Sequence, residues 1–529
     1  MTIDLRNAPV LVVGAGIMGA GIVQVAALAG HRVMLFDTRD GAAMQARDKL
    51  ATTLGVLAEK GKLSLDAAHA AIGRIEALAA LADARDAGLV VEAIVEQLDA
   101  KRSLMRELEG IVATDAVLAT NTSSISVTAI GNGLQHPGRL VGMHFFNPVP
   151  LMKLVEVVSG LQTAPAVAEA IAGLASHWGK VAVHAKSTPG FIVNRIARPF
   201  YAETLALLHE QAATPQVLDA CLKASGFRMG PCELMDLIGH DTNFAVTNSV
   251  YEANFFDKRY VPSLVQREMV AGGLLGRKSG RGFYRYEDGA AQPRPLPVAV
   301  HEAPASARQV TVHGHGAVAD ALERSATAAL APQGWGPARE RDSDWVGLAI
   351  DGARLVLTDG RTAQQLAADL GTPDVAVFDR PIGQLMQLMQ LMQLTQLAQP
   401  MPPAPPGTAL AYALAPSASD AWRAQAPAWL AALGYAPLPV ADAPGLVVAR
   451  TVAMLVNEAA DAVLQGVCDP AGADAAMKLG LNYPAGPFEW LARWSVPGVV
   501  GVVQALDREY RGERYRVSPW LRRQHRFHL

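Results

Sequence analysis

The 529-residue chain has few charged residues and few cysteines, and its charges nearly balance. Asp, Glu, Lys and Arg together make up 18% of the chain, and the formal net charge is −3. Such a balance gives no reason to expect nucleic acid or an acidic membrane as a partner. Cys221, Cys232 and Cys468 have no metal-ligand spacing and form no disulfide framework. We therefore expect no metal and a reducing compartment, the cytoplasm.

Long apolar runs are also absent from the sequence. No stretch approaches the roughly 20 apolar residues needed to cross a bilayer. The N-terminus has no basic segment before its first apolar run, so we expect neither a membrane span nor a signal peptide. Half of the residues are hydrophobic, which suits well-buried α/β and helical cores, and the length predicts three or four domains.

The first forty residues contain the pattern around which the sequence is organised. An aliphatic run at residues 10–13 predicts a strand buried on both faces, and an alanine-rich segment at 20–28 predicts a helix. Between them, three glycines have the G-x-G-x-x-G spacing of dinucleotide-binding loops. Such a loop lets the backbone approach a pyrophosphate, and the helix N-terminus offers its N–H groups to the phosphates. The residues of this loop are Gly14, Ala15, Gly16, Ile17, Met18 and Gly19.

An acidic residue at the end of the next predicted strand indicates which dinucleotide binds. The strand covers residues 33–36 and is followed by Asp37. A carboxylate at this place can accept hydrogen bonds from both hydroxyls of the adenosine ribose, and it would repel the 2′-phosphate of NADP. The sequence therefore predicts NAD as the cofactor.

Strands and helices alternate through the rest of this region. Residues 38–80 are predicted to be helical, and buried strands are expected at 89–93 and 117–120, an order typical of a doubly wound parallel sheet. Ligands of such sheets bind at the carboxyl ends of the strands, where Glu96 and the segment Asn-Thr-Ser-Ser at 121–124 would lie. We interpret residues 1–186 as a Rossmann-type NAD-binding domain.

His144 and Glu156 are ionisable residues within apolar segments. Glu156 lies in a predicted strand, where an unpaired buried carboxylate would be costly, so it needs a partner. His144 is the obvious candidate. The alternative is that His144 is a core histidine with satisfied hydrogen bonds and that Glu156 lies at an exposed edge. The residues taken alone leave both interpretations open.

After this domain the apolar pattern changes. We interpret residues 187–285 as an all-α domain and the Ala- and Pro-rich residues 286–308 as a linker. Residues 309–440 predict a degenerate α/β lobe, whose first turn imitates a dinucleotide loop but has Ala319 in place of the third glycine. We expect no cofactor there. Within the lobe, residues 384–406 contain a Leu-Met-Gln repeat followed by prolines, which is typical of a tolerated loop expansion.

Residues 441–529 repeat the helical domain. Matching landmarks recur 255 or 256 positions further along the chain, a spacing that indicates a duplicated domain. The second copy has Ala449 where the first has Asn194, and it lacks the glycine-rich segment, residues 276–284, that ends the first copy. We therefore interpret the second copy as structural. The matched pairs include Pro189 and Pro444, Gly190 and Gly445, Arg195 and Arg450, Glu203 and Glu458, Asp219 and Asp474, Lys223 and Lys478, Gly230 and Gly486, Pro231 and Pro487, Glu233 and Glu489, Arg259 and Arg514, and Tyr260 and Tyr515.

In combination, these motifs resemble the L-3-hydroxyacyl-CoA dehydrogenases. The resemblance runs from the N-terminus to about Tyr284 with no motif missing. The second helical domain and the segment 355–361 look like the long bacterial form of the family, which is associated with phenylacetate catabolism and acts on 3-hydroxyadipyl-CoA. The motifs that carry the resemblance are the glycine loop with Asp37 and the segments 90–96, 121–124, 144–148, 154–157 and 188–195.

The resemblance implies that NAD oxidises a (3S)-3-hydroxyacyl-CoA to the 3-oxoacyl-CoA. His144 is similar to the family's general base, and imidazole, with a reference pKa of about 6.5, suits proton removal near neutrality. Glu156 is similar to its partner, which fixes the tautomer and stabilises the imidazolium. Ser123 and Asn194 look like the residues that hydrogen-bond the reacting oxygen, and Asn147 would help to order the dyad and the substrate.

Further family positions surround the two ligands. Glu96 and Lys101 match positions near the ribose and the nicotinamide of NAD. Thr53 and Lys60 fall where the family contacts the CoA, and Lys60 could meet a phosphate. In this family the first helical domain commonly forms a two-fold dimer interface. The resemblance therefore implies that the second copy replaces a partner subunit in an intrachain pseudo-dimer, while self-association of the whole chain stays open.

Three other functions remain to be separated from this one. A 3-hydroxybutyryl-CoA dehydrogenase is one alternative, because the sequence does not reveal the length of the acyl chain. A related β-hydroxyacid or sugar-acid dehydrogenase would share the cofactor domain but generally uses a catalytic lysine in place of the His144–Glu156 dyad. A non-catalytic, crystallin-like NAD-binding protein is the remaining alternative, and the intact candidate residues argue against it.

Overall fold

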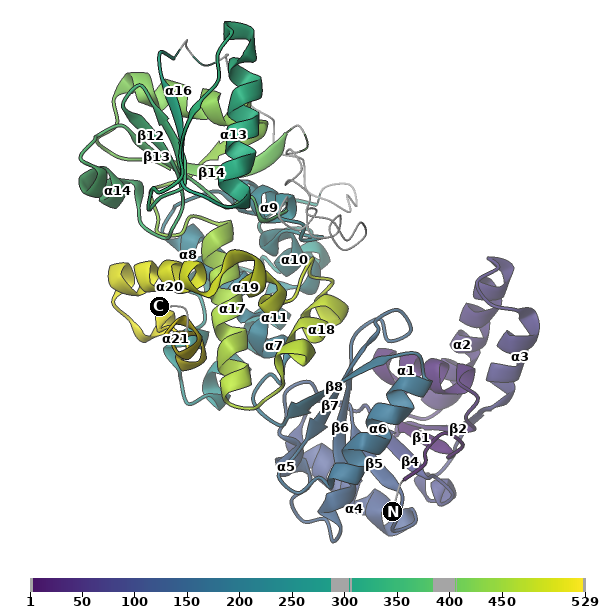
Figure 1. The fold of residues 1–529 in the computed structure, drawn as a ribbon. Coiled ribbons are helices and arrows are strands. Elements are labelled where there is room, and N and C mark those ends of the chain that lie inside the picture. The colour runs from purple at the N-terminus through teal and green to yellow at the C-terminus, as the bar shows by residue number, and fades with distance from the viewer. Residues whose placement is uncertain (1–2, 287–303, 305–306, 384–404, 406, 527–529) are drawn as a thin grey trace. The chain divides into compact units, whose positions relative to one another are not determined.

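A computed structural model of the chain describes residues 3–286, 304, 307–383, 405 and 407–526. The chain divides into two compact units (Figure 1). The first comprises residues 1–195 and 462–481, and the second comprises residues 196–461 and 482–529. Most of the expected linker and of the Leu-Met-Gln repeat, residues 287–303 and 384–404, lies outside the described residues.

The first unit is built on an eight-stranded sheet with the order β3-β2-β1-β4-β5-β6-β7-β8. Neighbouring strands are parallel except β6 and β7, which are antiparallel. The central strands are aliphatic and buried, as expected for a sheet covered on both faces. The strands are β1 Val10–Val13, β2 Val33–Phe36, β3 Ile75–Ala77, β4 Leu89–Glu92, β5 Val117–Thr120, β6 Leu140–Phe145, β7 Leu154–Ser159 and β8 Val181–Lys186.

Helices cover both faces of this sheet. α1, α2, α3 and α6 share one hydrophobic core with the strands, and α4 and α5 lie on the far side in Figure 1. α18, from much later in the chain, packs on β7 and β8. The Rossmann-type fold predicted from the sequence is confirmed. The helices are α1 Ile17–Leu28, α2 Ala42–Glu59, α3 Leu65–Gly73, α4 Leu98–Ile111, α5 Val127–Ile130, α6 Pro165–His177, α7 Val193–Ile196 and α18 Pro470–Leu481.

The helical prediction for residues 38–80 is wrong at its end. α2 and α3 are present, but β3 follows them and pairs in parallel with β2. Ile75 is 4% exposed in this edge strand. Its burial and the pairing with β2 override a local pattern that continues the helix.

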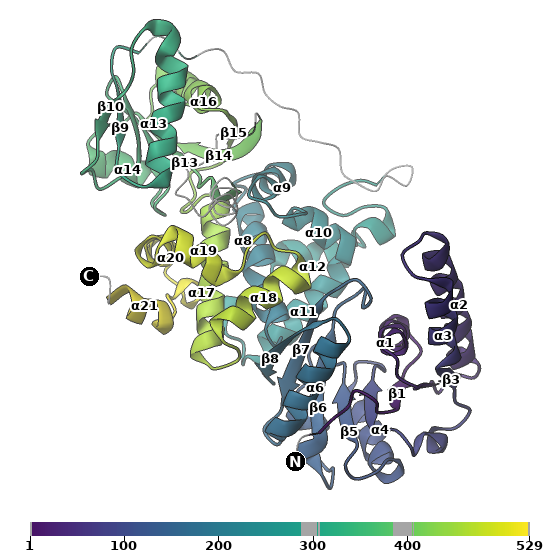
Figure 2. The same cartoon turned by 45° about the vertical axis from the view of Figure 1, so that its right-hand side comes forward.

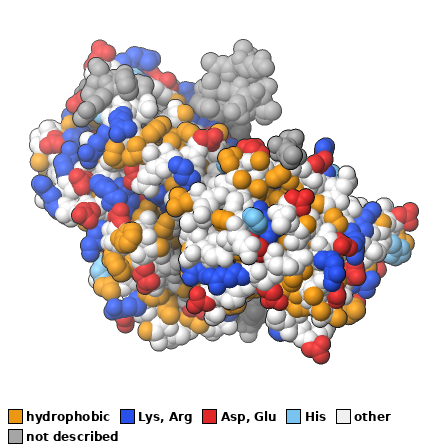
Figure 3. Space-filling view, turned by 90° about the horizontal axis from the view of Figure 1, so that it is seen from below, with side chains coloured by type: hydrophobic (Ala, Val, Ile, Leu, Met, Phe, Trp, Pro, Cys, Tyr) orange, Lys and Arg blue, Asp and Glu red, His pale blue; other side chains and the backbone are white. Residues whose placement is uncertain are grey.

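The second unit contains two sets of helices and a seven-stranded sheet. The helices are α8 Arg198–His209, α9 Pro215–Ala224, α10 Pro231–Ile238, α11 His240–Ala253, α12 Leu264–Ala271, α17 Val448–Leu464, α19 Pro487–Trp494, α20 Val496–Tyr510 and α21 Pro519–Arg526. Among the described residues, no helix has both the length and the hydropathy needed to span a membrane. Acidic and basic side chains are interspersed over the face shown in Figure 3, in keeping with the small net charge.

The seven-stranded sheet forms the α/β lobe, and its strand order is β10-β9-β11-β12-β13-β14-β15. α13 and α16 pack on one face in one core (Figure 2), and α14 packs with a second cluster. The strands are β9 Val310–His313, β10 Ala338–Glu340, β11 Gly347–Ile350, β12 Ala353–Leu357, β13 Val375–Phe378, β14 Thr408–Leu414 and β15 Tyr435–Pro439. The helices are α13 Ala317–Leu330, α14 Ala363–Leu370 and α16 Asp420–Ala432.

Candidate active site

The loop between β1 and α1 holds its backbone open at the helix N-terminus. Gly14 has φ +109°, and a Cβ atom there would lie 2.5 Å from the carbonyl oxygen of Ala93. A Cβ atom on Gly19 would lie 1.8 Å from the carbonyl oxygen of Gly14, so the helix packs too closely for any side chain. Gly16 is exposed, and a Cβ atom there would meet nothing within 4 Å. The loop therefore leaves room for a pyrophosphate at the start of α1.

Asp37 stands beside this loop at the end of β2. Its Oδ2 accepts a hydrogen bond from the Ala15 amide at 2.8 Å, and its Oδ1 accepts one from the Arg39 amide at 2.9 Å. The Arg39 guanidinium donates to both carboxylate oxygens at 3.0 Å. Chiefly because of the Arg39 side chain, and against the effect of burial, the pKa of Asp37 falls to about 2. The carboxylate is therefore ionised and able to accept from ribose hydroxyls at neutral pH.

A cavity of about 560 Å³ opens next to Asp37. It is walled by the glycine loop, by residues 37–39, by residues 93–95 after β4, and by Ala100, Ser103 and Leu104 of α4. The carboxylate, the open loop and this cavity fit the ribose, pyrophosphate and adenine of NAD. Ile17 is 78% exposed at the mouth of the loop, and Met18 is half-buried beside it.

Lys101 is buried between two carboxylates. Its side chain is 1% exposed, and its Nζ lies 2.7 Å from Glu92 Oε1 and 3.2 Å from Glu96 Oε2. Glu92 is itself fully buried and also accepts hydrogen bonds from Thr120 Oγ1 at 2.7 Å and from the Ile94 amide at 2.8 Å. This network ties the ends of β4 and β5 to α4.

Glu96 organises the segment that follows β5. Its Oε1 accepts hydrogen bonds from Thr122 Oγ1 at 2.7 Å, from the amides of Ser123 and Ser124 at 2.9 and 3.1 Å, and from both serine hydroxyls. Burial alone would raise the pKa of Glu96, but Lys101 and these donors outweigh burial and lower it. The ionised carboxylate therefore fixes the position of Ser123.

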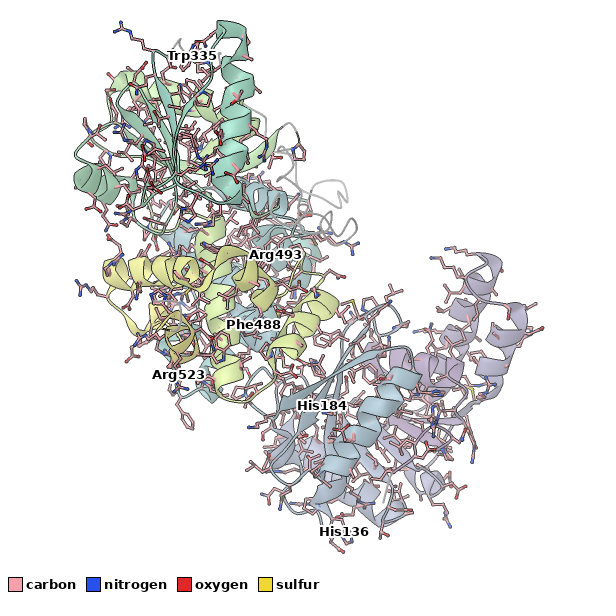
Figure 4. All side chains as sticks on the ribbon, in the orientation of Figure 1. His136, His184, Trp335, Phe488, Arg493 and Arg523 are labelled. Carbon is pink, nitrogen blue, oxygen red and sulfur yellow. The ribbon has the colours of Figure 1, made fainter. Side chains whose placement is uncertain are left out.

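His144 and Glu156 face each other across the antiparallel strands β6 and β7. His144 Nδ1 lies 2.6 Å from Glu156 Oε2, and the two residues are 5% and 0% exposed. The other oxygen, Glu156 Oε1, accepts hydrogen bonds from the amides of Ile192 and Val193 at 3.1 and 2.9 Å. The alternative in which Glu156 lies at an exposed edge is therefore wrong. By contrast, His136 and His184 of this unit are exposed (Figure 4).

Aromatic side chains pack against the imidazole, and Asn194 connects the start of α7 to the serine segment. The ring centroids of Phe146 and Phe191 lie 4.5 and 5.8 Å from that of His144. Asn194 follows the two amides that contact Glu156, and its Nδ2 lies 3.5 Å from the carbonyl oxygen of Ser123. The structure thus brings Ser123, His144, Glu156 and Asn194 into one connected site.

The remaining expected residues lie on the surface of the same unit. Asn147 is exposed and precedes a proline in a cis peptide bond. Thr53 and Lys60 are exposed on and just after α2, and Thr53 Oγ1 donates to the carbonyl of Lys49 at 2.9 Å. Among the residues that the structure describes, no group of three His, Cys, Asp or Glu side chains could hold a metal ion.

Two parts of this arrangement escaped the sequence reasoning. Glu92 is an acidic residue in an aliphatic strand, which is the same signal that identified Glu156, and it should have been given the same weight. Asn121 accepts a hydrogen bond from the Phe145 amide through Oδ1 at 2.8 Å and so joins the end of β5 to the strand that carries His144. No local sequence pattern reports that contact.

Comparison with known proteins identifies the class of protein. A model of the 3-hydroxyacyl-CoA dehydrogenase NAD-binding domain matches residues 9–188, and a model of the C-terminal domain of that enzyme matches residues 190–286 and 445–527. The chain is 40% identical over 514 residues to the 3-hydroxyadipyl-CoA dehydrogenase of Escherichia coli, covering 97% of this chain and 96% of that one. It is 42% identical over 276 residues to a probable 3-hydroxybutyryl-CoA dehydrogenase of Deinococcus radiodurans, covering 52% and 99%.

A solved structure extends this likeness over the whole fold. The crystal structure of a 3-hydroxybutyryl-CoA dehydrogenase from Escherichia coli superimposes with a TM-score of 0.84 at 39% identity and covers 98% of each chain. The protein is thus an NAD-dependent oxidoreductase. It belongs to the 3-hydroxyacyl-CoA dehydrogenase family, as the sequence motifs predicted.

Proposed function

We propose that this protein oxidises the 3-hydroxyl group of a (3S)-3-hydroxyacyl-CoA to a 3-oxo group through the His144–Glu156 dyad. The observation that carries the proposal is the buried contact of 2.6 Å between His144 Nδ1 and Glu156 Oε2. NAD, when bound, supplies the acceptor for the hydride that leaves C3 of the substrate. The chain must then remove the hydroxyl proton and hold the oxygen from which it leaves.

His144 takes the proton. Because Glu156 accepts only, the Nδ1 atom that faces it carries hydrogen, and the lone pair of Nε2 stays available to the substrate hydroxyl. The imidazolium that forms is stabilised by the carboxylate at its back, and Phe146 and Phe191 limit access of water.

Ser123 and Asn194 bind the reacting oxygen. The single hydrogen of the substrate hydroxyl points to His144, so Ser123 would donate to the oxygen, and its hydroxyl, 3.2 Å from Glu96 Oε1, would turn from Glu96 to do so. The Asn194 amide is the donor for the oxygen once its proton has left. Glu96 then acts by positioning Ser123, and we assign Lys101 to positioning Glu96 near the nicotinamide ribose, because its Nζ is enclosed by carboxylates.

Gly14, Gly16 and Gly19, with Ile17 and Met18 between them, would hold the pyrophosphate, and Asp37 the adenosine ribose. Thr53 of α2 and Lys60, just after that helix, would contact the CoA, and both residues are exposed, as this contact requires. Asn147, next to the dyad in sequence and exposed, would contact the bound ligands. We infer that the reaction takes place in the cytoplasm, since Cys221, Cys232 and Cys468 are all free thiols.

We also propose that the two helical domains, residues 187–285 and 441–529, form a pseudo-dimer. In the second unit, Glu203 of one copy accepts from Arg450 Nε at 2.8 Å and from Arg514 Nη2 at 2.9 Å of the other copy. The matched residue Glu458 accepts from Tyr260 OH at 2.6 Å and lies 3.4 Å from Arg259 Nη1. Each copy thus binds the other through equivalent residues, as the two subunits of a two-fold dimer do.

3-Hydroxyadipyl-CoA is our first candidate substrate, because the Escherichia coli relative that matches 97% of this chain is named 3-hydroxyadipyl-CoA dehydrogenase. 3-Hydroxybutyryl-CoA is the second, because the structure that superimposes over the whole chain has that name. Initial rates of NAD reduction with 3-hydroxybutyryl-, 3-hydroxyhexanoyl- and 3-hydroxyadipyl-CoA will rank them. Absence of turnover with all three, in a preparation that binds NAD, would contradict the dehydrogenase assignment.

A further inference from the structure

The sheet of the α/β lobe repeats the order of the sheet in the first unit. The run β10-β9-β11-β12-β13-β14-β15 corresponds to β2-β1-β4-β5-β6-β7-β8. Every pair of neighbours has the same relative direction except the pairs that include β11. The connecting helices correspond as well, since α13, α14 and α16 join the counterparts of the strands joined by α1, α5 and α6.

The spacing of 255 positions continues back from the helical copies into the two sheets. α6 and α16 begin and end 255 positions apart. Each is followed by a glycine in the left-handed region, Gly179 with φ 71° and Gly434 with φ 99°, again 255 apart. The strand pairing keeps the spacing too, because Leu154 lies opposite Val181 and Ala409 lies opposite Ala436.

A carboxylate caps the following helix in both places. In the first unit, Glu156 accepts from the amides of Ile192 and Val193. In the lobe, Asp379 accepts from the amides at the positions 255 further on, Val447 at 3.0 Å and Val448 at 2.6 Å. The two helices, α7 and α17, are therefore held by their sheets in the same way.

The residues equivalent to Glu156, His144 and Asn194 are all changed in the lobe. The position 255 after Glu156 is Ala411, and the residue that pairs with it is Asp379, whose amide donates to the Ala411 carbonyl at 2.9 Å. Asp379 thus stands in the register of His144. Ala449 replaces Asn194. The lobe therefore has no imidazole here, and the carboxylate in its place, that of Asp379, caps α17.

The part of the lobe that corresponds to the predicted NAD site is altered as well. Gly14 donates to the carbonyl of the last residue of β2 at 2.8 Å, and Gly314 donates to that of Glu340, the last residue of β10, at 2.9 Å. The next residue after β2 is Asp37, whereas after β10 it is Arg341. Residues 341–346 lead into β11, and residues 351–352 connect it directly to β12. This part of the lobe therefore has no counterpart of α4, which walls the cavity in the first unit.

We propose that residues 307–526 are a reduced second copy of the dehydrogenase, here called the silent copy, which has lost both NAD binding and the dyad and serves as a built-in partner subunit. The loss of chemistry rests on the roles proposed above for His144, Glu156 and Asn194. The duplication itself rests only on topology, spacing and hydrogen bonds.

Crosswise packing supports the partner role. α18 belongs to the silent copy and packs on β7 and β8, with Gly480 so close that a Cβ atom there would lie 2.8 Å from Leu154 Cδ2 and 3.1 Å from Val193 Cγ2. Its counterpart 255 positions earlier, α9, packs on β14, the counterpart of β7. Each helical copy therefore covers the sheet of the other. In this way the silent copy supports the strand that carries Glu156.

Calorimetric titration of the full-length protein with NAD tests the silent copy. We expect one NAD per chain. Asp37→Ala and Arg341→Ala are a matched pair at equivalent positions, and only Asp37→Ala should weaken binding, by roughly tenfold or more for a lost charge-assisted contact. Two NAD per chain, or saturable NADP binding that Arg341→Ala removes, would overturn the proposal. Because no turnover is needed, the outcome is independent of the proposed reaction.

A second pair of variants tests the partner role. Gly480→Leu should lower kcat by roughly tenfold to a hundredfold, because it displaces β7 and the start of α7, and small displacements of reacting groups have effects of this size. The affinity for NAD should stay within twofold, which also shows that the first unit is folded. Gly173→Leu on α6, where a Cβ atom would meet nothing within 4 Å, is the control. An unchanged kcat in Gly480→Leu would show that the silent copy does not support the site.

Discussion

The substitution Glu156→Gln separates two tasks that one carboxylate performs. Oε2 faces His144 Nδ1, and Oε1 faces the amides of Ile192 and Val193. A glutamine has one accepting oxygen and one donating NH₂ group, so it can satisfy only one of the two sides. The effect of the substitution depends on which side the oxygen takes.

The energies of the two orientations decide this. With the NH₂ group toward α7, two buried amides lose their acceptor, at about 1–3 kcal/mol for each unsatisfied group. With the oxygen toward α7, the NH₂ group donates to Nδ1 of His144, and the imidazole instead carries its hydrogen on Nε2. That orientation keeps the acceptor of both amides but removes the base from the substrate side. We therefore expect the second orientation, a folded protein, and a kcat lower by about 10²- to 10⁴-fold, the usual contribution of a positioned base.

Initial rates of NAD reduction, NAD affinity by calorimetry, and the unfolding temperature measure the three consequences. NAD affinity should stay within twofold and the unfolding temperature within a few degrees. Glu169→Gln is the control, because that side chain is 75% exposed on α6. Turnover within threefold of the wild type would refute the dyad. An unfolded Glu156→Gln protein would refute the ordering of the two orientations.

Four further predictions follow from the contacts described above. Asp37→Ala should lose much of the preference for NAD over NADP, measured as the ratio of kcat/KM, and an unchanged ratio would contradict the ribose contact. His144→Ala should lower turnover by roughly 10²- to 10⁴-fold without changing the NAD dissociation constant. If this variant turned over as fast as the wild type, His144 would not be the general base. Glu203→Gln should destabilise the chain by about 3 kcal/mol in thermal unfolding, because the buried Arg450 and the partly buried Arg514 lose the buried carboxylate they share, whereas the exposed Glu268→Gln should not. A fragment ending at Tyr286 should aggregate or dimerise in light scattering, since its helical face is uncovered; a stable, active monomer would count against the pseudo-dimer.

The cofactor loop could be predicted from the sequence because its requirements are local. Strand, glycines, helix and acid all fall within the first 37 residues, and each needs a particular residue type at a fixed spacing. The dyad could not be settled in the same way. His144 and Glu156 are opposite each other only because β6 and β7 pair in one register, and a shift by one residue would turn Glu156 to the other face of the sheet.

The surroundings of Lys101 show what sequence reasoning cannot supply. Its position matches a family residue near NAD, yet its amine is enclosed by Glu92 and Glu96. Whether a lysine on α4 reaches a ligand or a buried acid depends on how the helix packs on the sheet. An acid in an aliphatic strand, as at Glu92, is the signal that predicts such a partner.

The duplication of the lobe could not be predicted from the sequence because its residues changed more than its strand order. Sequence comparison at a spacing of 255 finds Gly179 and Gly434, which end α6 and α16. The apolar residues around them differ, since many side chains of similar volume can fill one core. A backbone position in the left-handed region accepts few residues other than glycine, whereas a core position accepts several aliphatic residues.

What the silent copy keeps distinguishes structural requirements from catalytic ones. A buried helix N-terminus with unsatisfied amides is costly in either copy, so a carboxylate is retained at both, as Glu156 or as Asp379. Nothing in folding requires a histidine opposite that acid, and in the lobe both members of the pair have been replaced. The capping contact of Glu156 therefore belongs to the fold, whereas its contact with His144 is the one that the proposed oxidation requires.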